Sequence, residues 1–208
     1  MSQSGLFREI AFFTSAADEG GLPPSQAEVA FAGRSNAGKS SAINALAQRH
    51  RMAFVSKTPG RTQQINFFSL GPARFLVDLP GYGYAKVPRG MRNDWEQLIS
   101  GYLQLRPALR GLIVIMDIRH PMKELDRQLL AWFHSTGKPA HVLLAKADKL
   151  GRQPQMEQLR NTSKILAADF PNVTVSLFSA HSRIGLDEAE AVLNRWYTRH
   201  TVDFARVK

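Results

Sequence analysis

The sequence predicts a three-layer α/β/α fold around a mostly parallel, six-stranded sheet. Short apolar runs, typical of buried strands, alternate with stretches of helical composition, which is the pattern of a parallel sheet covered on both faces. In addition, residues 33–41 read GRSNAGKSS and fit the pattern GxxxxGK[ST], in which a glycine-rich loop joins a strand to a helix. An ordinary turn with a helix cap would also contain glycine and serine, but the flanking strand and helix patterns favour a phosphate-binding loop.

The individual elements follow from apolar runs and from breaks at glycine and proline. Residues 1–25 are expected to form an N-terminal extension that packs on the domain, because residues 6–14 are apolar and residues 16–25 are rich in glycine and proline. Residues 26–208 are expected to form one domain. Within it we expect strands at 29–32, 64–70, 73–77, 112–116, 141–145 and 173–178, the second and third as a hairpin, and helices at 40–48, 93–105, 123–134, 154–168 and 186–198.

The composition is that of an ordinary globular domain. Of the 208 residues, 44% are apolar and 21% charged, which suits one domain with a substantial core. The absence of cysteine excludes disulfides, zinc fingers and thiolate catalysis. No apolar run is long enough to span a bilayer, and Arg8 and Glu9 stand where a secretory signal would be apolar, so we expect a cytoplasmic protein without a membrane partner.

The charge balance points to an anionic partner. The chain has 27 lysines and arginines against 17 acidic residues, which gives a formal net charge of +10 and a sequence pI near 10.3. No acidic residue occurs between Phe31 and Val77. Such a surface favours polyanions such as nucleic acid. A basic surface that serves only solubility remains the alternative, because net charge does not identify a partner.

The phosphate loop supplies the groups that a bound nucleotide needs. Glycines let the backbone curl so that successive N–H groups and a helix N-terminus face the phosphates. Lys39 would give a charge to the β- and γ-phosphates, and Ser40 would give a hydroxyl to Mg²⁺. The residues expected to line this part of the site are Gly33, Arg34, Ser35, Asn36, Ala37, Gly38, Lys39, Ser40 and Ser41.

A second motif, DLPG, follows the expected strand 73–77. Asp78 would hold the metal, usually through water, and the Gly81 N–H would meet the γ-phosphate, with Leu79 and Pro80 between them. Aspartate, proline and glycine are also typical of an ordinary turn, so the motif gains its meaning from the phosphate loop upstream. The intervening loop KTPGRTQ contains two threonines that could complete the metal shell, and the residues alone do not choose between Thr58 and Thr62.

The base would be read by the motif AKAD, which follows the expected strand 141–145. Asp148 can accept hydrogen bonds from both N1 and N2 of guanine, a pair of donors that adenine lacks. Lys146 can lay its aliphatic stem along the base plane. Residues 178–180, which read FSA, would cover the other side with backbone N–H groups near the base carbonyl. The residues assigned to this part are Ala145, Lys146, Ala147, Asp148, Phe178, Ser179 and Ala180.

In this order, GRSNAGKS, TPGRTQ, DLPGYGYA, AKAD and FSA resemble the EngB family of ribosome-biogenesis GTP-binding proteins, a translation-factor-related class, over nearly the whole chain. The resemblance implies a Ras-like P-loop GTPase fold, binding of GTP, GDP and Mg²⁺, slow hydrolysis and a role in large ribosomal subunit assembly, with an association with division septation. It also implies that Ser40 and Thr62 are the metal-binding hydroxyls. The nucleotide-binding part of the TPGRTQ loop is then Gly60, Arg61, Thr62 and Gln63.

The chain departs from the family at Ala145, where members usually have threonine or asparagine. Loss of that hydrogen-bonding side chain should loosen the tie between the base loop and the phosphate loop. A neutral hydrogen bond contributes about 0.5 to 1.5 kcal/mol, so we expect weaker affinity with guanine selection by Asp148 retained.

The position after Gly81 bears on the hydrolysis rate. Ras-like enzymes carry there a glutamine that orients the attacking water, whereas this chain has Tyr82, so we expect slow hydrolysis. In related potassium-activated GTPases, an asparagine at the place of Asn36 coordinates K⁺. We therefore hypothesise that Asn36 binds K⁺ or that the ribosome supplies the missing charge; Asn36 could instead only brace the loop. The residues expected to act in catalysis are Asn36, Lys39, Thr62 and Gly81.

Two further readings compete with a GTP-driven switch on the large ribosomal subunit or its RNA. One is an RNA-binding assembly module whose nucleotide is structural, and the other is a phosphate-loop kinase, which the base-reading AKAD disfavours. A monomer is the expected state.

The histidines show no metal-ligand spacing, and the tryptophans are expected in the core. Tyr82 and Tyr84 would either contact RNA or protein or pack within their own loop.

Overall fold

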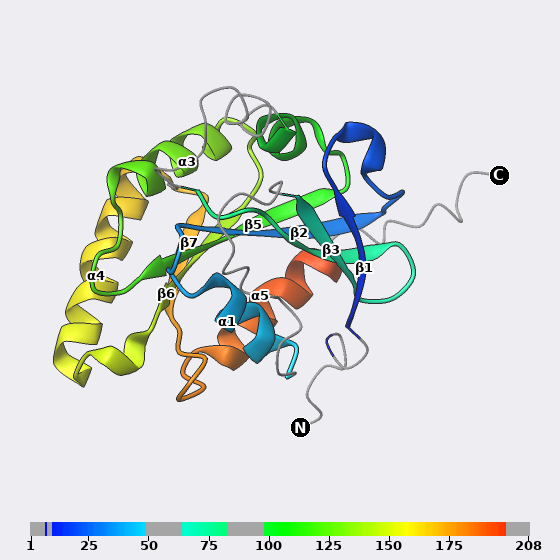
Figure 1. The fold of residues 1–208 in the computed structure, drawn as a ribbon. Helices are drawn as coiled ribbons and strands as arrows, with labels where there is room; N and C mark the ends of the chain where they lie inside the picture. The colour runs from blue at the N-terminus through cyan, green and yellow to red at the C-terminus, as the bar shows by residue number, and fades with distance from the viewer. Residues whose placement is uncertain (1–6, 8–9, 49–63, 83–97, 199–208) are drawn as a thin grey trace.

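The computed structural model describes residues 7, 10–48, 64–82 and 98–198, which form a three-layer α/β/α domain (Figure 1). Seven strands make one sheet in the order β1-β3-β4-β2-β5-β6-β7. The four pairings from β4 to β7 are parallel, and β3 and β4 form the predicted antiparallel hairpin. The strands are β1 (Ala11–Ala16), β2 (Ala27–Gly33), β3 (Ile65–Ser69), β4 (Arg74–Asp78), β5 (Leu109–Asp117), β6 (Ala140–Ala145) and β7 (Val173–Leu177).

Helices cover both faces of the sheet. The helices α1 (Lys39–Leu46) and α5 (Leu186–Thr198) pack on one face; residues 98–105, which are helical, pack on the other with α3 (Glu124–His134) and α4 (Arg152–Asp169) (Figure 1). Within the described ranges, short 3₁₀ turns lie at Glu19–Gly21 and Ala147–Lys149. No helix in the described ranges is long and apolar enough to cross a membrane.

The central strand β5 explains why the sheet is buried on both faces. Leu112, Val114 and Met116 point into the cluster beneath α3 and α4, whereas Ile113 and Ile115 point into the cluster beneath α1 and α5. All five are fully buried, and this is why the strand reads as a continuous apolar run. The fold class and the order of the strands and helices are therefore confirmed for the described residues, whereas residues 93–97 of the expected helix 93–105 lie outside them.

The expected strand count of six was wrong, because β1 adds a seventh strand. β1 pairs antiparallel with β3 at the edge of the sheet, and its register shifts between Phe12 and Thr14. Phe12 and Phe13 are both more than half exposed. An edge strand with a bulge and exposed aromatic side chains lacks the alternation of a half-buried strand, so its sequence gave no period-2 signal. The boundary proposed at residue 25 stays a prediction.

Candidate nucleotide-binding site

The sequence motifs meet because each follows a strand of the parallel part of the sheet. β2 ends at Gly33, β4 at Asp78, β5 at Asp117, β6 at Ala145 and β7 at Leu177. Since parallel strands present their carboxyl ends at one edge, the loops after them form one cluster. Ligands of open α/β sheets bind in this place.

The phosphate loop turns sharply from β2 into α1. Gly38 has φ of 113°, a left-handed conformation that side chains disfavour, and α1 begins at the next residue. A Cβ on Gly38 would lie 3.5 Å from the Ala145 Cβ, so the two loops touch at this point. The Ala42 N–H donates to the Gly38 carbonyl at 2.9 Å, which closes the first turn of α1. The loop thus presents a helix N-terminus toward the predicted phosphate position.

Lys39, the first residue of α1, forms an ion pair with Asp78 at the end of β4. Asp78 is almost completely buried, with 6% of its surface exposed. Ser40 follows in the same turn of α1. A hydroxyl and a carboxylate are the hard oxygen donors that Mg²⁺ prefers, so the chemistry of Ser40 and Asp78 fits the expected metal. Thr62 and its neighbours Gly60, Arg61 and Gln63 lie outside the described residues, as do Thr58 and Tyr84.

The segment after β4 lies directly against the phosphate loop. The Tyr82 N–H donates to the Gly33 carbonyl, and the Ser35 N–H donates to the Tyr82 carbonyl, both at 3.3 Å. A Cβ on Gly81 would lie 3.3 Å from the Ser35 Oγ. This Oγ is buried and has no hydrogen-bond partner within the described ranges. An unpaired buried hydroxyl between these loops is what a phosphate oxygen could satisfy.

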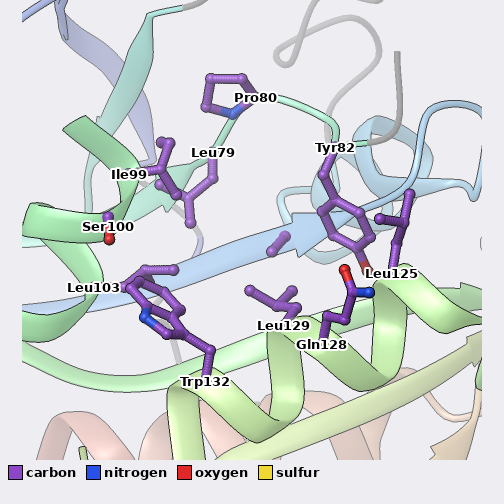
Figure 2. Close-up of a pocket in the computed structure, with 11 residues that line it drawn as sticks. Leu79, Pro80, Tyr82, Ile99, Ser100, Leu103, Leu125, Gln128, Leu129 and Trp132 are labelled. Atoms are coloured by element: carbon purple, nitrogen blue, oxygen red, sulfur yellow. The ribbon is translucent and has the colours of Figure 1, made fainter. Parts of the chain in front are cut away.

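The Tyr82 side chain turns toward α3. Its hydroxyl donates to Asp126 Oδ1 at 2.8 Å, and its ring lines an apolar cavity of about 240 Å³ together with Leu79, Leu103 and Trp132 (Figure 2). Burial, followed by the charge of Asp126, raises the Tyr82 pKa well above 10. The phenol therefore stays protonated and bound to α3. Tyr82 was expected either to contact RNA or protein or to pack within its own loop; its side chain instead packs against α3.

The base loop is tied to the phosphate loop by Lys146. Its Nζ donates to the Asn36 carbonyl at 2.6 Å and to Asp117 Oδ2 at 3.0 Å. Asn36 and Lys146 both have positive φ, of 63° and 61°. Left-handed backbone at non-glycine residues persists where surrounding contacts hold it, and this bond joins the two positions. Ala145 contributes only its buried methyl group near Gly38, so the tie in this chain passes through Lys146.

Asp148, which is predicted to recognise guanine, accepts a hydrogen bond from the loop that follows β7. Ser179 is fully buried, and its hydroxyl donates to Asp148 Oδ1 at 2.6 Å. Lys149 lies 3.1 Å from Asp148 Oδ2. The Ser179 hydrogen bond is the main cause that lowers the pKa of Asp148, so the carboxylate is an acceptor at neutral pH. The Ala147 N–H also donates to the Phe178 carbonyl at 3.0 Å, so the AKAD and FSA loops pack together.

The structure narrows the role predicted for the FSA amides. The Phe178 N–H donates to Leu144 and the Ser179 N–H to Ile184, each to a carbonyl at 2.9 Å. Both amides are therefore engaged within the protein, which leaves Ala180 as the candidate to face a base carbonyl. Ser179 acts through its side chain instead, by orienting Asp148.

Two aspartates were missed in the sequence. Asp117 ends β5 and holds both Lys146 and Arg119, and the Arg119 hydrogen bond is the main cause that lowers its pKa. A terminal aspartate after a buried strand, as at Asp78, was the available signal. Asp126 lies inside α3, and no local pattern marks it. Asp126 forms an ion pair with Arg34. Within the described ranges, Arg34 is the residue of the phosphate loop whose side chain bonds to α3.

Comparisons with known proteins agree with this geometry. Residues 28–146 match the family model of the 50S ribosome-binding GTPases. A probable GTP-binding protein EngB of Methylobacillus flagellatus is 55% identical over 92% of this chain and 93% of that protein. The corresponding protein of Thiobacillus denitrificans, with the same description, is 56% identical over 94% and 95% of the two chains.

Solved structures with a similar fold are more distant in sequence. A crystal structure of a probable GTP-binding protein engB has a TM-score of 0.65 and 18% identity, and the match covers 82% of this chain and 98% of that one. A crystal structure of Era, in complex with MgGDPNP and nucleotides 1506–1542 of 16S ribosomal RNA, has a TM-score of 0.63 and 20% identity over 82% and 56% of the two chains. At such identities the likeness supports the fold alone.

Proposed function

Because this chain belongs to the EngB family of GTP-binding proteins, a family of GTPases, we propose that it binds GTP and GDP with Mg²⁺, hydrolyses GTP slowly and acts as a nucleotide-dependent switch in assembly of the large ribosomal subunit. The observation that carries the proposal is the contact between the base loop and the phosphate loop. Lys146 links the two, and Ser179 orients an ionised Asp148. This arrangement supports the proposal that Asp148 recognises guanine.

The described residues divide the work of binding. The phosphate loop and the first turn of α1 would receive the phosphates, and Asp148 would select guanine. Ser40 and Asp78, with Thr62 of the TPGRTQ loop, would hold Mg²⁺. When bound, Mg²⁺ neutralises phosphate charge.

The position of Tyr82 supports the proposal of slow hydrolysis. A protonated phenol whose hydroxyl donates to Asp126 does not accept a proton from the attacking water. Another group must therefore supply charge in the transition state. We propose K⁺ held by Asn36, which is an exposed residue of the phosphate loop, or a group from the ribosome.

The cation proposal is tested by GTP turnover in KCl and NaCl at equal ionic strength, with wild type and Asn36→Ala. Faster turnover of wild type in KCl, lost in the variant, is the expected result. Equal rates in all four measurements would refute the proposal that K⁺ supplies the charge and would leave the ribosome as its source.

A ribosomal partner is supported by the description of the matching family and by the net charge of +10. Such a role would place the protein in the cytoplasm, and we expect it to act as a monomer. A link to septation stays an expectation from the family resemblance.

The switch is tested by pull-down of ribosomal subunits at moderate salt with GDP, with a non-hydrolysable GTP analogue and without nucleotide. We expect the large subunit to be retained preferentially with the analogue, because the γ-phosphate would order the loops that contact it. Equal retention in all three states would instead favour an RNA-binding module whose nucleotide is structural. Equal loss of ribosome binding at high salt would not separate the switch from the RNA-binding module, since both use the basic surface.

A further inference from the structure

Asp126 is a buried carboxylate with no assigned role. It lies in the first turn of α3 and has no exposed surface. Buried charges are stable in proteins only when partners satisfy them, so the identity of those partners shows what Asp126 holds in place.

The partners of Asp126 come from three different segments. Arg34 of the phosphate loop donates from Nε to Oδ1 at 3.2 Å, and the Tyr82 hydroxyl donates to the same oxygen at 2.8 Å. The Lys123 N–H donates to Oδ2 at 3.0 Å. A second nitrogen of the Arg34 guanidinium donates to the His120 carbonyl at 2.9 Å. One carboxylate therefore fastens the phosphate loop and the segment after β4 to the same helix.

The position of Gly81 depends on this fastening. Gly81 immediately precedes Tyr82, whose backbone is paired with Gly33 and Ser35 and whose side chain is bound to Asp126. Gly81 is thereby kept against the phosphate loop. A Cβ added to Gly81 would lie 3.5 Å from the Gly33 carbonyl oxygen. Without the phenol bond, the hydrogen bonds that hold this segment within the described ranges would be the two 3.3 Å backbone bonds of Tyr82 and the 3.0 Å bond from the Leu79 N–H to the Phe31 carbonyl.

Within the described ranges, the Tyr82 hydroxyl has one hydrogen-bond partner, Asp126. The ring lines the largely apolar cavity between residues 98–105 and α3, where Leu125, Leu129 and the polar Gln128 form the α3 side (Figure 2). Apolar contacts of this kind do not fix the direction of a ring. The charge-assisted bond to Asp126 does, because such bonds are short and directional.

We infer that Asp126 is a positioning residue for the γ-phosphate, acting through Tyr82 to hold the Gly81 N–H where a nucleoside triphosphate would meet it. This rests on the proposed function, in which Gly81 binds the γ-phosphate. A donor fixed in advance costs no reorganisation when the ligand arrives, so the fastening strengthens triphosphate binding. It adds nothing to the binding of a diphosphate, which has no γ-phosphate to meet.

The test uses the full chain and compares Kd for GDP with Kd for a non-hydrolysable GTP analogue, both with Mg²⁺, by titration of fluorescent nucleotides. Tyr82→Phe removes only the hydroxyl and leaves the ring, Arg34 and the α3 N-terminus untouched. We expect it to weaken the analogue relative to GDP by about tenfold, the size of one lost hydrogen bond to a charged group. Asp126→Asn should shift the ratio in the same direction.

The double variant shows whether Asp126 acts through Tyr82. If it does, Tyr82→Phe should add no further shift on the Asp126→Asn background. Asp169→Asn is the matched control, because it changes a carboxylate in an exposed ion pair with Arg127 and should leave the ratio unchanged.

An unchanged ratio in Tyr82→Phe, with wild type binding both nucleotides, would overturn the inference and leave the proposed function intact. Equal weakening of both nucleotides would also overturn it, since that result means general loosening of the site. Wild type that binds neither nucleotide would overturn the proposed function together with the inference.

Discussion

Replacement of Lys146 by methionine should weaken GDP and GTP by the same factor. Methionine keeps an aliphatic stem for the base but removes the ammonium that binds the Asn36 carbonyl at 2.6 Å and Asp117 at 3.0 Å. Hydrogen bonds to charged groups contribute about 1.5 to 3 kcal/mol each. The Lys146 side chain is 30% exposed, so solvent screens these bonds. We therefore take the lower end, about 1.5 kcal/mol, which corresponds to roughly a tenfold loss of affinity.

The loss should be equal for the two nucleotides because the bond joins the base loop to the backbone of Asn36 and is not directed at the γ-phosphate. Equilibrium titration with GDP and with a non-hydrolysable GTP analogue measures both affinities. Lys164→Met, at an exposed lysine of α4, is the control and should match wild type. Unchanged affinities in Lys146→Met would refute the idea that this side chain ties the loops together. A loss of affinity for the GTP analogue alone would refute the expectation that both nucleotides are weakened equally. It would instead place Lys146 at the γ-phosphate.

Two further predictions concern the base and the core. Asp148→Asn should move preference from GTP toward XTP in competition binding, because the acceptor facing N2 becomes a donor; continued preference for GTP would show that the base-site assignment is wrong. His141 is 4% exposed, and burial lowers its pKa from 6.5 to about 4. Between those values the unfolded chain binds a proton that the folded chain does not, so the free energy of unfolding should fall by up to about 3 kcal/mol as pH drops from 6.5 to 4. Urea unfolding at pH 5 and pH 7.5 measures this dependence, which should be weaker in His141→Gln; an equal dependence in the two proteins would assign the acid sensitivity to other groups.

Much of the site was predictable because its motifs are local in sequence and fixed in place by the sheet. The loop at 33–41, the DLPG turn and AKAD each follow an apolar strand, and parallel pairing brings their ends together. The hairpin of β3 and β4 was readable for the same reason, since Gly71 and Pro72 break the apolar run between them. In these places the local pattern and the tertiary arrangement agree.

The parts that escaped prediction depend on contacts without a local pattern. β1 is held by pairing with β3, and its own side chains do not alternate. The FSA amides were expected to face the base, but Phe178 and Ser179 use theirs in the protein, at carbonyls of Leu144 and Ile184. Backbone partners of this kind are set by how two loops pack, and residue types do not specify them.

Tyr82 shows how far a substitution can be interpreted from sequence. Its chemistry predicted what is lost, because a phenol cannot replace the carboxamide that orients water. What the tyrosine contributes depends on Asp126, which lies 44 residues further along the chain on a helix with no nucleotide motif. The same carboxylate binds Arg34, so the position that lacks the glutamine is fastened to the phosphate loop through α3. Under the slow hydrolysis and the switch role that we propose, this arrangement would matter most for how well the loops distinguish GTP from GDP.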